Sequence, residues 1–254
     1  MTSNPRFTLE RAPLEHRPRA ASVAAIEDVT PSYRRITLTG DFAGFDSLGA
    51  DDHLRIFFLP DGTVLPDDPE SRGAQMREHP SREFTPVAWD AQSLTLDFVL
   101  HGGGVAGTWA ANAVVGSVAG IGGPRGSLVL GGAPAWWLLA GDRTALPAIR
   151  RHLARVEPGT PVDVVLVAED PADEQELETP GDLSVTWVRS QAELAAALER
   201  VPEREGDGFA FIAAEQSIVK PGRALLTARG VDLARAVVKG YWKRGTSEYH
   251  EPRR

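Results

Sequence analysis

The chain has 254 residues, a length that suits one large domain or two ordinary ones. Hydrophobic residues make up 42% and charged residues 24%, as in ordinary globular proteins. The absence of cysteine excludes disulfides, cysteine-ligated zinc, iron–sulfur clusters and thiolate catalysis. The net charge of -8 argues against a general nucleic-acid-binding role, which requires a basic surface. Apolar runs fall short of the about 18 residues that a membrane span needs, and the N-terminus does not resemble a signal peptide. We therefore expect a cytoplasmic protein.

Charges are unevenly distributed along the chain. Residues 161–218 contain 14 acidic and three basic residues, whereas residues 219–254 contain nine basic and three acidic ones. No Asp or Glu lies between Asp97 and Asp142. A buried run of strands explains part of this acid-free window, and a surface that binds an anion would also require it.

Residues 20–132 are predicted to form short β-strands separated by turns. Apolar and polar residues alternate most clearly at residues 94–100, which is typical of a half-buried strand. Strands at this spacing predict an antiparallel barrel. The expected strands are residues 22–29, 33–39, 53–59, 83–89, 94–100, 117–121 and 127–130. The polar, proline-rich segment 61–80 is expected to be a long mobile loop.

From Ala135 the pattern changes to apolar strands that alternate with amphipathic helices. This alternation predicts a parallel sheet covered on both faces. The expected strands are residues 136–140, 162–167, 183–188, 209–213 and 235–242. The first helix places Leu146, Ile149 and Leu153 on one face, with Thr144 as its N-cap. The other expected helices are residues 191–201 and 217–229.

Gly102, Gly104 and Gly107 have the G-x-G-x-x-G spacing, between the strand at 94–100 and a short helix expected at 108–113. A Rossmann dinucleotide site also needs an acidic residue about 20 positions further on, and the acid-free window provides none. An NAD fingerprint is therefore excluded here. Two interpretations remain open: a simple glycine-rich turn, or a loop whose backbone N–H groups and helix N-terminus bind a diphosphate.

The segment Arg82-Glu83-Phe84-Thr85-Pro86-Val87 precedes this loop. An arginine pairs with phosphate, an aromatic ring stacks on a flavin, and a threonine hydroxyl bonds the polar edge of the flavin ring. Each residue taken singly also fits an ordinary barrel strand. Their order before the glycine-rich loop favours a flavin nucleotide site.

These segments and several others resemble the siderophore-interacting protein family of FAD-dependent ferric-siderophore reductases, which are ferredoxin-reductase-like flavoproteins. The resemblance runs from about residue 18 to residue 246. It rests on Arg82-x-Phe84-Thr85-Pro86, Asp97-Phe-Val-Leu-His101-Gly, Trp109-Ala110, Gly123-Pro124, Ala140-Gly141-Asp142 with Ala145-Leu-Pro-Ala-Ile149, and Gly240-Tyr241-Trp242-Lys243-Arg244-Gly245. It implies an antiparallel FAD-binding β-barrel at residues 18–132 and an NAD(P)H-binding α/β domain at residues 135–246.

The resemblance also implies particular cofactor contacts. For FAD the implied residues are Arg82, Phe84, Thr85, Val87, Asp97, Val99, His101, Val105, Ala106, Gly107 and Thr108. For NADPH or NADH they are Asp142, Thr144, Ala145, Leu146 and Glu215, and Trp242 is expected to shield or stack on the cofactor. The loop at Gly104 is one residue shorter than the family pattern, so we expect backbone contacts with the phosphates. Lys220-Pro221-Gly222 interrupts a helix that related sequences continue.

The reaction that the resemblance implies passes electrons from NAD(P)H through FAD to the Fe(III) of a ferric siderophore and releases Fe(II). Flavin accepts a hydride and donates electrons singly, so no catalytic acid, base or nucleophile is required. Because many ferric siderophores are anionic, we expect basic residues to bind them. The candidates are Arg55, Arg125, Lys243 and Arg244.

Alternative functions are a flavin reductase for another acceptor and a noncatalytic ferric-siderophore carrier. The histidines do not have the spacing of metal ligands, so no protein-bound metal is expected. We expect a monomer without a nucleic-acid or membrane partner. The siderophore class and the choice between NADPH and NADH stay open.

Overall fold

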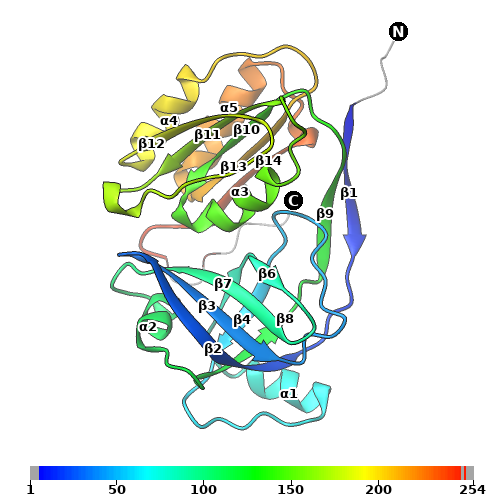
Figure 1. The fold of residues 1–254 in the computed structure, drawn as a ribbon, viewed down its shortest axis with the longest axis vertical. Helices are drawn as coiled ribbons and strands as arrows, with labels where there is room; N and C mark the ends of the chain where they lie inside the picture. Colours follow the sequence, from blue (N-terminus) through cyan, green and yellow to red (C-terminus); the bar gives the residue numbers. More distant parts are fainter. Residues whose placement is uncertain (1–5, 247–248, 250–254) are drawn as a thin grey trace. The chain divides into compact units, whose positions relative to one another are not determined.

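The computed structural model describes residues 6–246 and 249, and the chain divides into two compact units (Figure 1). The β unit is Arg11–Val129, and the α/β unit is Met1–Glu10 together with Leu130–Arg254. Among the described residues, no helix is long and apolar enough to cross a membrane.

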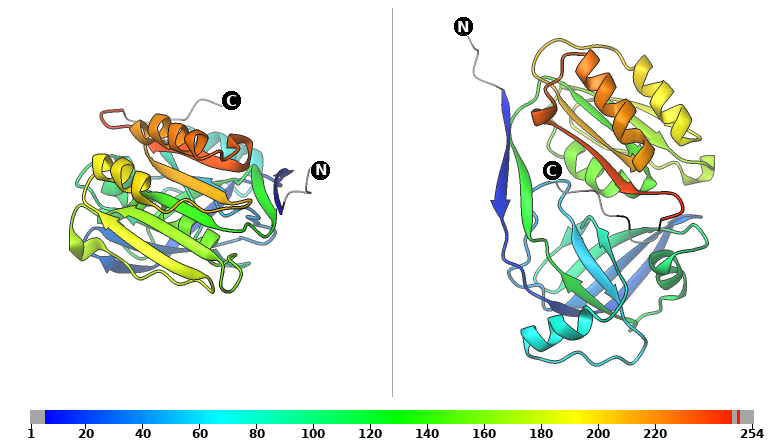
Figure 2. Two further views of the ribbon diagram at one scale, coloured as in Figure 1. Left: turned by 90° about the horizontal axis from the view of Figure 1, so that it is seen from above. Right: turned by 180° about the vertical axis from the view of Figure 1, so that it is seen from behind.

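The β unit is built on a curled, seven-stranded antiparallel sheet (Figures 1 and 2). Its strand order is β5-β4-β8-β2-β3-β7-β6. The strands are β2 (Arg19–Thr30), β3 (Tyr33–Gly40), β4 (Leu54–Phe58), β5 (Ser81–Phe84), β6 (Ala88–Trp89), β7 (Ser93–Val99) and β8 (Val118–Gly122). This confirms the predicted antiparallel β-rich half.

The two end strands of this sheet, β5 and β6, are consecutive in the chain. Only residues 85–87 separate them, and four peptide steps span at most about 14 Å. The two ends of the sheet therefore lie near each other, as in a rolled, barrel-like sheet. The single strand predicted at 83–89 is wrong, because Pro86 has no N–H to donate to a sheet. Strand pairing resumes after Val87, whose N–H donates to the Thr95 carbonyl at 2.9 Å.

The segment predicted to be a mobile loop, residues 61–80, contains helix α1 (Pro69–Met76). The Asp68 carboxylate caps it by accepting the Ser71 N–H at 2.8 Å. Met76 is buried and packs against Phe57 and Leu59. The loop prediction is therefore wrong for this stretch. An Asp followed by Pro at the first helical position is a helix-start signal that the proline content obscured.

A further helix and a two-stranded ribbon complete the first part of the chain. Helix α2 (Val105–Asn112) begins three residues before the predicted position. Strand β9 (Gly126–Gly132) pairs with β1 (Phe7–Pro13), which the sequence pattern did not predict. The start of β1 is held by the Arg235 guanidinium, which lies 4.2 Å from the centre of the Phe7 ring and donates to the Phe7 carbonyl at 3.1 Å.

The α/β unit contains a five-stranded parallel sheet with the order β12-β11-β10-β13-β14. The strands are β10 (Trp137–Asp142), β11 (Pro161–Val167), β12 (Asp182–Val188), β13 (Phe209–Glu215) and β14 (Ala236–Trp242). The α-helices are α3 (Leu146–Leu153), α4 (Gln191–Arg200) and α5 (Val219–Ala228), and the 3-10 turns are η1 (Arg143–Ala145), η2 (Pro171–Asp173), η3 (Gln216–Ile218) and η4 (Leu233–Arg235). Helix α3 covers one face of the sheet, and α4 and α5 cover the other (Figure 2). The predicted parallel sheet with both faces covered is confirmed.

Lys220-Pro221-Gly222 does not interrupt α5. Pro221 lies in the first turn of the helix, where a backbone N–H has no helical acceptor. A Cβ on Gly222 would lie 3.3 Å from Val238 Cγ1 and 3.4 Å from Ile212 Cδ1. The glycine therefore lets the helix pack closely against β13 and β14.

The order of the parallel strands creates a topological switch point. After β10 the chain continues to β11 and β12 on one side of the sheet, and it then returns to form β13 and β14 on the other. The helix that follows β10 covers one face of the sheet, and the helix that follows β13 covers the opposite face. In open parallel sheets, ligands bind beyond the carboxyl ends of the strands at such a point.

Candidate functional site

Three predicted cofactor residues are the last residues of neighbouring strands. Asp142 ends β10, Glu215 ends β13 and Trp242 ends β14. Because these strands are parallel, their carboxyl ends meet at one edge of the sheet (Figure 1). This edge includes the switch point between β10 and β13, so the structure brings together residues that are 100 positions apart.

The Asp142 carboxylate is the centre of a hydrogen-bond network at this edge. Its Oδ1 accepts the Thr144 N–H at 2.9 Å and the Thr144 hydroxyl at 2.5 Å. Its Oδ2 accepts the Trp242 indole N–H at 2.8 Å and the Gln191 side-chain amide at 3.0 Å. Asp142 is buried, with 6% of its surface exposed. The prediction that Thr144 caps the helix is wrong, because Asp142 caps the η1 turn before α3 and Thr144 is its donor.

The turn that follows Asp142 is tightly packed. A Cβ on Gly141 would lie 2.3 Å from the Ala213 carbonyl oxygen and 2.6 Å from Ala145 Cβ, so only glycine fits there. Ala145 and Leu146, both predicted to contact the nicotinamide cofactor, are fully buried. They pack inside the unit, so neither residue is open to solvent in the folded chain.

Glu215 holds the chain that follows β14. Its carboxylate accepts the Ser217 N–H at 2.7 Å and the Arg244 N–H at 3.2 Å. Burial by itself raises the pKa of Glu215, but the hydrogen bonds from Ser217 and Arg244 and the positive charge of Arg244 outweigh it and lower that pKa overall. The residue is therefore ionised at neutral pH. Asp142 and Glu215 together fix the position of residues 242–244.

The glycine-rich loop leads into the N-terminus of α2. Gly104 is the N-cap and has φ of 71° and ψ of 157°, a conformation that suits glycine. The first-turn amides of Val105, Ala106 and Gly107 have no acceptor within the helix. The His101 ring lies against this turn, because a Cβ on Gly107 would be 3.8 Å from His101 Nε2. Five of the implied FAD residues therefore lie at this helix start, including the exposed Thr108.

Aromatic contacts connect this helix to the strand that carries Arg82. The Phe84 ring lies 4.5 Å from Phe98, and Phe98 lies 5.6 Å from Trp109 of α2. Thr85, directly after β5, is buried. The structure thus brings the implied flavin strand and the implied phosphate loop together through a shared aromatic core.

Asp97 forms an ion pair inside the β unit. Its side chain is fully buried and forms a bidentate ion pair with Arg35, at 2.8 Å and 2.9 Å. Arg35 faces Asp97 directly on the neighbouring strand β3. The hydrogen bond that Arg35 donates to the Asp97 carboxylate is the main reason that the pKa of Arg35 is raised. Val99, two residues further on, is half-buried.

The four basic residues proposed for substrate binding differ in their partners. Arg55 donates to Glu83 at 2.6 Å and to the Ser81 hydroxyl at 3.1 Å, which neutralises its charge. Arg125 is exposed between β8 and β9 and has no ion pair within the described part of the chain. Lys243 and Arg244 are exposed in a turn closed by the Thr246 N–H bond to the Lys243 carbonyl.

Two residues in these networks were missed by the sequence reasoning. Arg35 carries no motif, and its pairing with Asp97 depends on strand register. Gln191 directly follows the Ser190 cap of α4 and lies 49 positions from Asp142. Its only signal was that a turn after a parallel strand lies at the same edge as the other strand ends.

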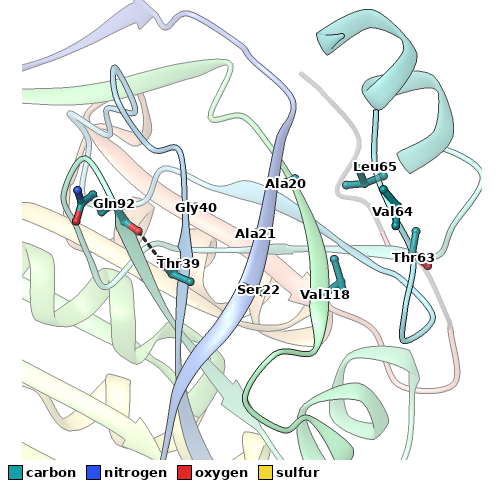
Figure 3. A pocket seen from close by; sticks show the side chains of 10 residues that line it. All are labelled: Ala20, Ala21, Ser22, Thr39, Gly40, Thr63, Val64, Leu65, Gln92 and Val118. Atoms are coloured by element: carbon teal, nitrogen blue, oxygen red, sulfur yellow. Dashed lines mark hydrogen bonds between the residues drawn. The ribbon is translucent and has the colours of Figure 1, made fainter. Parts of the chain in front are cut away.

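An open groove of about 660 Å³ lies on the β unit (Figure 3). It is lined by Ala20, Ala21, Ser22, Thr39, Gly40, Thr63, Val64, Leu65, Gln92 and Val118. Leu65 and Val64 precede α1, and Val64 is 85% exposed. None of these residues is charged or belongs to the predicted sites, so the groove adds nothing to the cofactor assignment.

The fold and these strand-end and helix-start sites define a class of two-part nucleotide-binding protein. The comparisons with known proteins narrow that class to one family. A family model described as siderophore-interacting protein matches residues 134–245, and one described as siderophore-interacting FAD-binding domain matches residues 22–128. The chain belongs to the siderophore-interacting protein family, as the sequence motifs predicted.

Full-length relatives agree with this assignment. The chain is 30% identical over 252 residues to the NADPH-dependent ferric-chelate reductase of Escherichia coli, which covers 95% of this chain and 99% of that protein. It is 31% identical to the ferric vibriobactin reductase ViuB of Vibrio cholerae, over 93% of this chain and 94% of that protein. The crystal structure of a siderophore utilization protein from T. fusca matches with a TM-score of 0.82 and 32% identity, over 96% of this chain and 98% of that chain.

Proposed function

We propose that this protein is an FAD-dependent oxidoreductase that uses NAD(P)H to reduce the Fe(III) of a ferric siderophore and releases Fe(II). The observation that carries the proposal is similarity over nearly the whole chain to relatives named as ferric-chelate and ferric vibriobactin reductases. Bound flavin would supply the conversion of a hydride into single electrons. The protein's own residues have to hold the two cofactors and the substrate in position.

The residues of the β unit fit FAD. The first turn of α2 offers unpaired backbone N–H groups to a diphosphate. No Asp or Glu lies between Asp97 and Asp142, so no acidic side chain of this stretch repels the diphosphate. Arg82, Phe84, Thr85 and Val87 would hold the flavin ring. Asp97, Val99 and His101 would border the path between ring and diphosphate, and the Asp97 side chain is held by its ion pair with Arg35. We assign this role to residues 18–132.

The carboxyl edge of the parallel sheet fits a nicotinamide cofactor, because it lies at the switch point where such ligands bind. Asp142, Thr144, Ala145, Leu146 and Glu215 border this edge, and Trp242 covers part of it. We assign NAD(P)H binding to residues 135–246. Reduced nicotinamide cofactors are made in the cytoplasm, so we propose that the protein works there. We also propose that it is a monomer.

An anaerobic titration tests the proposal. We expect the purified protein to show the absorption of oxidised FAD, NADPH or NADH to bleach it, and a ferric siderophore to restore it. Restoration no faster than with free FAD at the same concentration would contradict ferric-siderophore reduction. Bleaching without restoration would instead favour a flavin reductase for another acceptor, and a flavin-free protein that binds the siderophore would be a carrier.

Variants of exposed bases test the substrate site. Arg125→Ala and Lys243→Ala each remove a charge that would pair with an anionic siderophore, a contact worth about 1.5 to 3 kcal/mol. We expect kcat/KM for the siderophore to fall about 10-fold or more, with unchanged flavin reduction by NAD(P)H. The matched control is Arg11→Ala on β1, which removes an exposed arginine that is outside the proposed sites.

A further inference from the structure

The orientation of the Gln191 side chain is determined by Asp142. A carboxylate only accepts hydrogen bonds, so the end of the Gln191 amide that lies 3.0 Å from Asp142 Oδ2 has to be the NH2 group. The carbonyl oxygen Oε1 therefore points away from Asp142. This chemical argument settles which end of the amide is nitrogen.

Gln191 Oε1 is buried but accepts no hydrogen bond within the described part of the chain. It is the only side-chain carbonyl or carboxyl oxygen in that state among the described residues. Buried acceptors are nearly always paired, because leaving one unpaired costs free energy. A ligand that donates a hydrogen bond at this point would remove that cost.

The surrounding charge restricts which ligand group can bind there. Gln191 Oε1 carries a partial negative charge, and the acidic side chains of Asp142 and Glu215 lie at the same sheet edge. This environment repels a phosphate and attracts a neutral donor. NAD(P)H carries such donors in its nicotinamide carboxamide and its ribose hydroxyls.

We propose that Gln191 is a cofactor-binding residue whose Oε1 accepts an N–H or O–H from an uncharged part of the bound nicotinamide dinucleotide. The inference rests on the proposed function and adds a residue to its nicotinamide site. Asp142 is the positioning residue, since the same Oδ2 atom orients both the Gln191 amide and the Trp242 indole.

Binding of NADP+ and NAD+ to the FAD-loaded protein, measured by calorimetry, tests this role without turnover. Gln191→Met keeps a side chain of similar length but removes the acceptor. We expect the Kd of the bound dinucleotide to rise about 5-fold or more. The control is Gln175→Met, since the Gln175 Oε1 already accepts a bond from Arg150. In both variants we expect the FAD content to equal that of the wild type. We also expect a ferric siderophore to re-oxidise the dithionite-reduced protein at the wild-type rate.

The 3-acetylpyridine analogue of NADP+, in which a methyl ketone replaces the carboxamide, separates the two donors. If the carboxamide donates, wild-type protein prefers NADP+ over the analogue and Gln191→Met abolishes the preference. If a ribose hydroxyl donates, the variant loses affinity for both ligands equally. Equal affinity of wild type and Gln191→Met for all three ligands would overturn the role of Gln191.

A measurement on the wild-type chain removes any dependence on how the variant folds. In protein labelled with 15N-glutamine, saturating NADP+ should shift the side-chain amide signal of Gln191, and an unshifted signal would overturn the proposal. Absence of dinucleotide binding to wild type would instead refute the proposed function as a whole.

Discussion

The indole N–H of Trp242 donates a 2.8 Å hydrogen bond to the carboxylate of Asp142, one hundred positions earlier in the chain. Trp242 is on the edge strand β14, and Asp142 is two strands away on β10, so the indole reaches across the end of β13. The Lys243–Thr246 turn follows directly. The position of Lys243 and Arg244, which we propose for substrate binding, therefore depends on a carboxylate at the carboxyl edge of the parallel sheet.

Trp242→Phe removes the indole donor and keeps an aromatic ring. Because the acceptor is a buried carboxylate, we expect the free energy of unfolding to fall by about 1.5 to 3 kcal/mol. Urea denaturation measures the change. Trp187→Phe on β12 is the control, since it makes a similar change on a strand at the other edge of the sheet. Equal losses in the two variants would show that the Asp142 bond contributes nothing particular.

Glu215 should make stability depend on pH. Its pKa is lower in the folded chain than the ordinary value of 4.5, so the unfolded chain binds more protons between these two values. The resulting stabilisation is complete above about pH 5 and is lost as the pH falls through the lowered pKa.

Denaturation of wild type and Glu215→Gln from pH 7 to pH 3 measures this dependence. We expect the stability difference between them to be largest near neutral pH and to shrink below pH 4.5. The exposed Glu199→Gln serves as the control. A difference that stays constant across this range would refute the role of the Glu215 charge.

The Arg35–Asp97 ion pair should matter more for stability than for FAD binding. We expect Asp97→Asn to lower the free energy of unfolding by about 1.5 to 3 kcal/mol, because it weakens a bidentate bond to a buried carboxylate. The control is Asp28→Asn, which weakens the Asp28–Arg34 pair in the same way. The Asp28 side chain is 60% exposed, and such pairs contribute about 0 to 1 kcal/mol to the free energy of unfolding.

The ratio of FAD to folded protein separates the two roles of Asp97. If the Asp97 side chain only stabilises the fold through its ion pair with Arg35, folded Asp97→Asn should keep its FAD. Loss of FAD at unchanged stability would show that Asp97 contacts the cofactor directly, as the family resemblance implies.

Gly104→Ala should disturb the proposed phosphate site. At φ of 71° and ψ of 157° a side chain is strained by about 1 to 3 kcal/mol, so alanine would favour another loop conformation. We expect weaker FAD retention during gel filtration and a lower melting temperature. Gly103→Ala is the matched control, because a Cβ there meets nothing within 4 Å. Retention of FAD at the wild-type level in Gly104→Ala would argue against the α2 N-terminus as the diphosphate site.

Much of the fold could be predicted because its signals are local. The alternation at Leu94, Leu96 and Phe98 places these side chains in one core, and the apolar runs of the second half form a parallel sheet. The exceptions are also local. The polar composition around Asp68-Pro69 predicted a loop and obscured the start of α1. Strand propensity predicted one strand at 83–89, and Pro86 separates that stretch into β5 and β6.

The candidate site was predicted less completely, because its partners are distant in sequence. Asp142, Glu215 and Trp242 could be selected as strand ends, but the hydrogen bonds that connect them to Gln191 and Arg244 depend on strand order. Arg55 looked like a free base in the sequence, and only the pairing of β4 with β5 placed Glu83 beside it.

The sequence by itself determined the two kinds of periodicity, the glycine-rich loop, the acid-free window and the motifs that identify the family. Tertiary structure alone decided which charges are neutralised and which side chain orients another. The physical reason is that periodicity and turn chemistry act over a few neighbouring residues, whereas a hydrogen bond between residues 142 and 242 exists only once the sheet has brought their strands together.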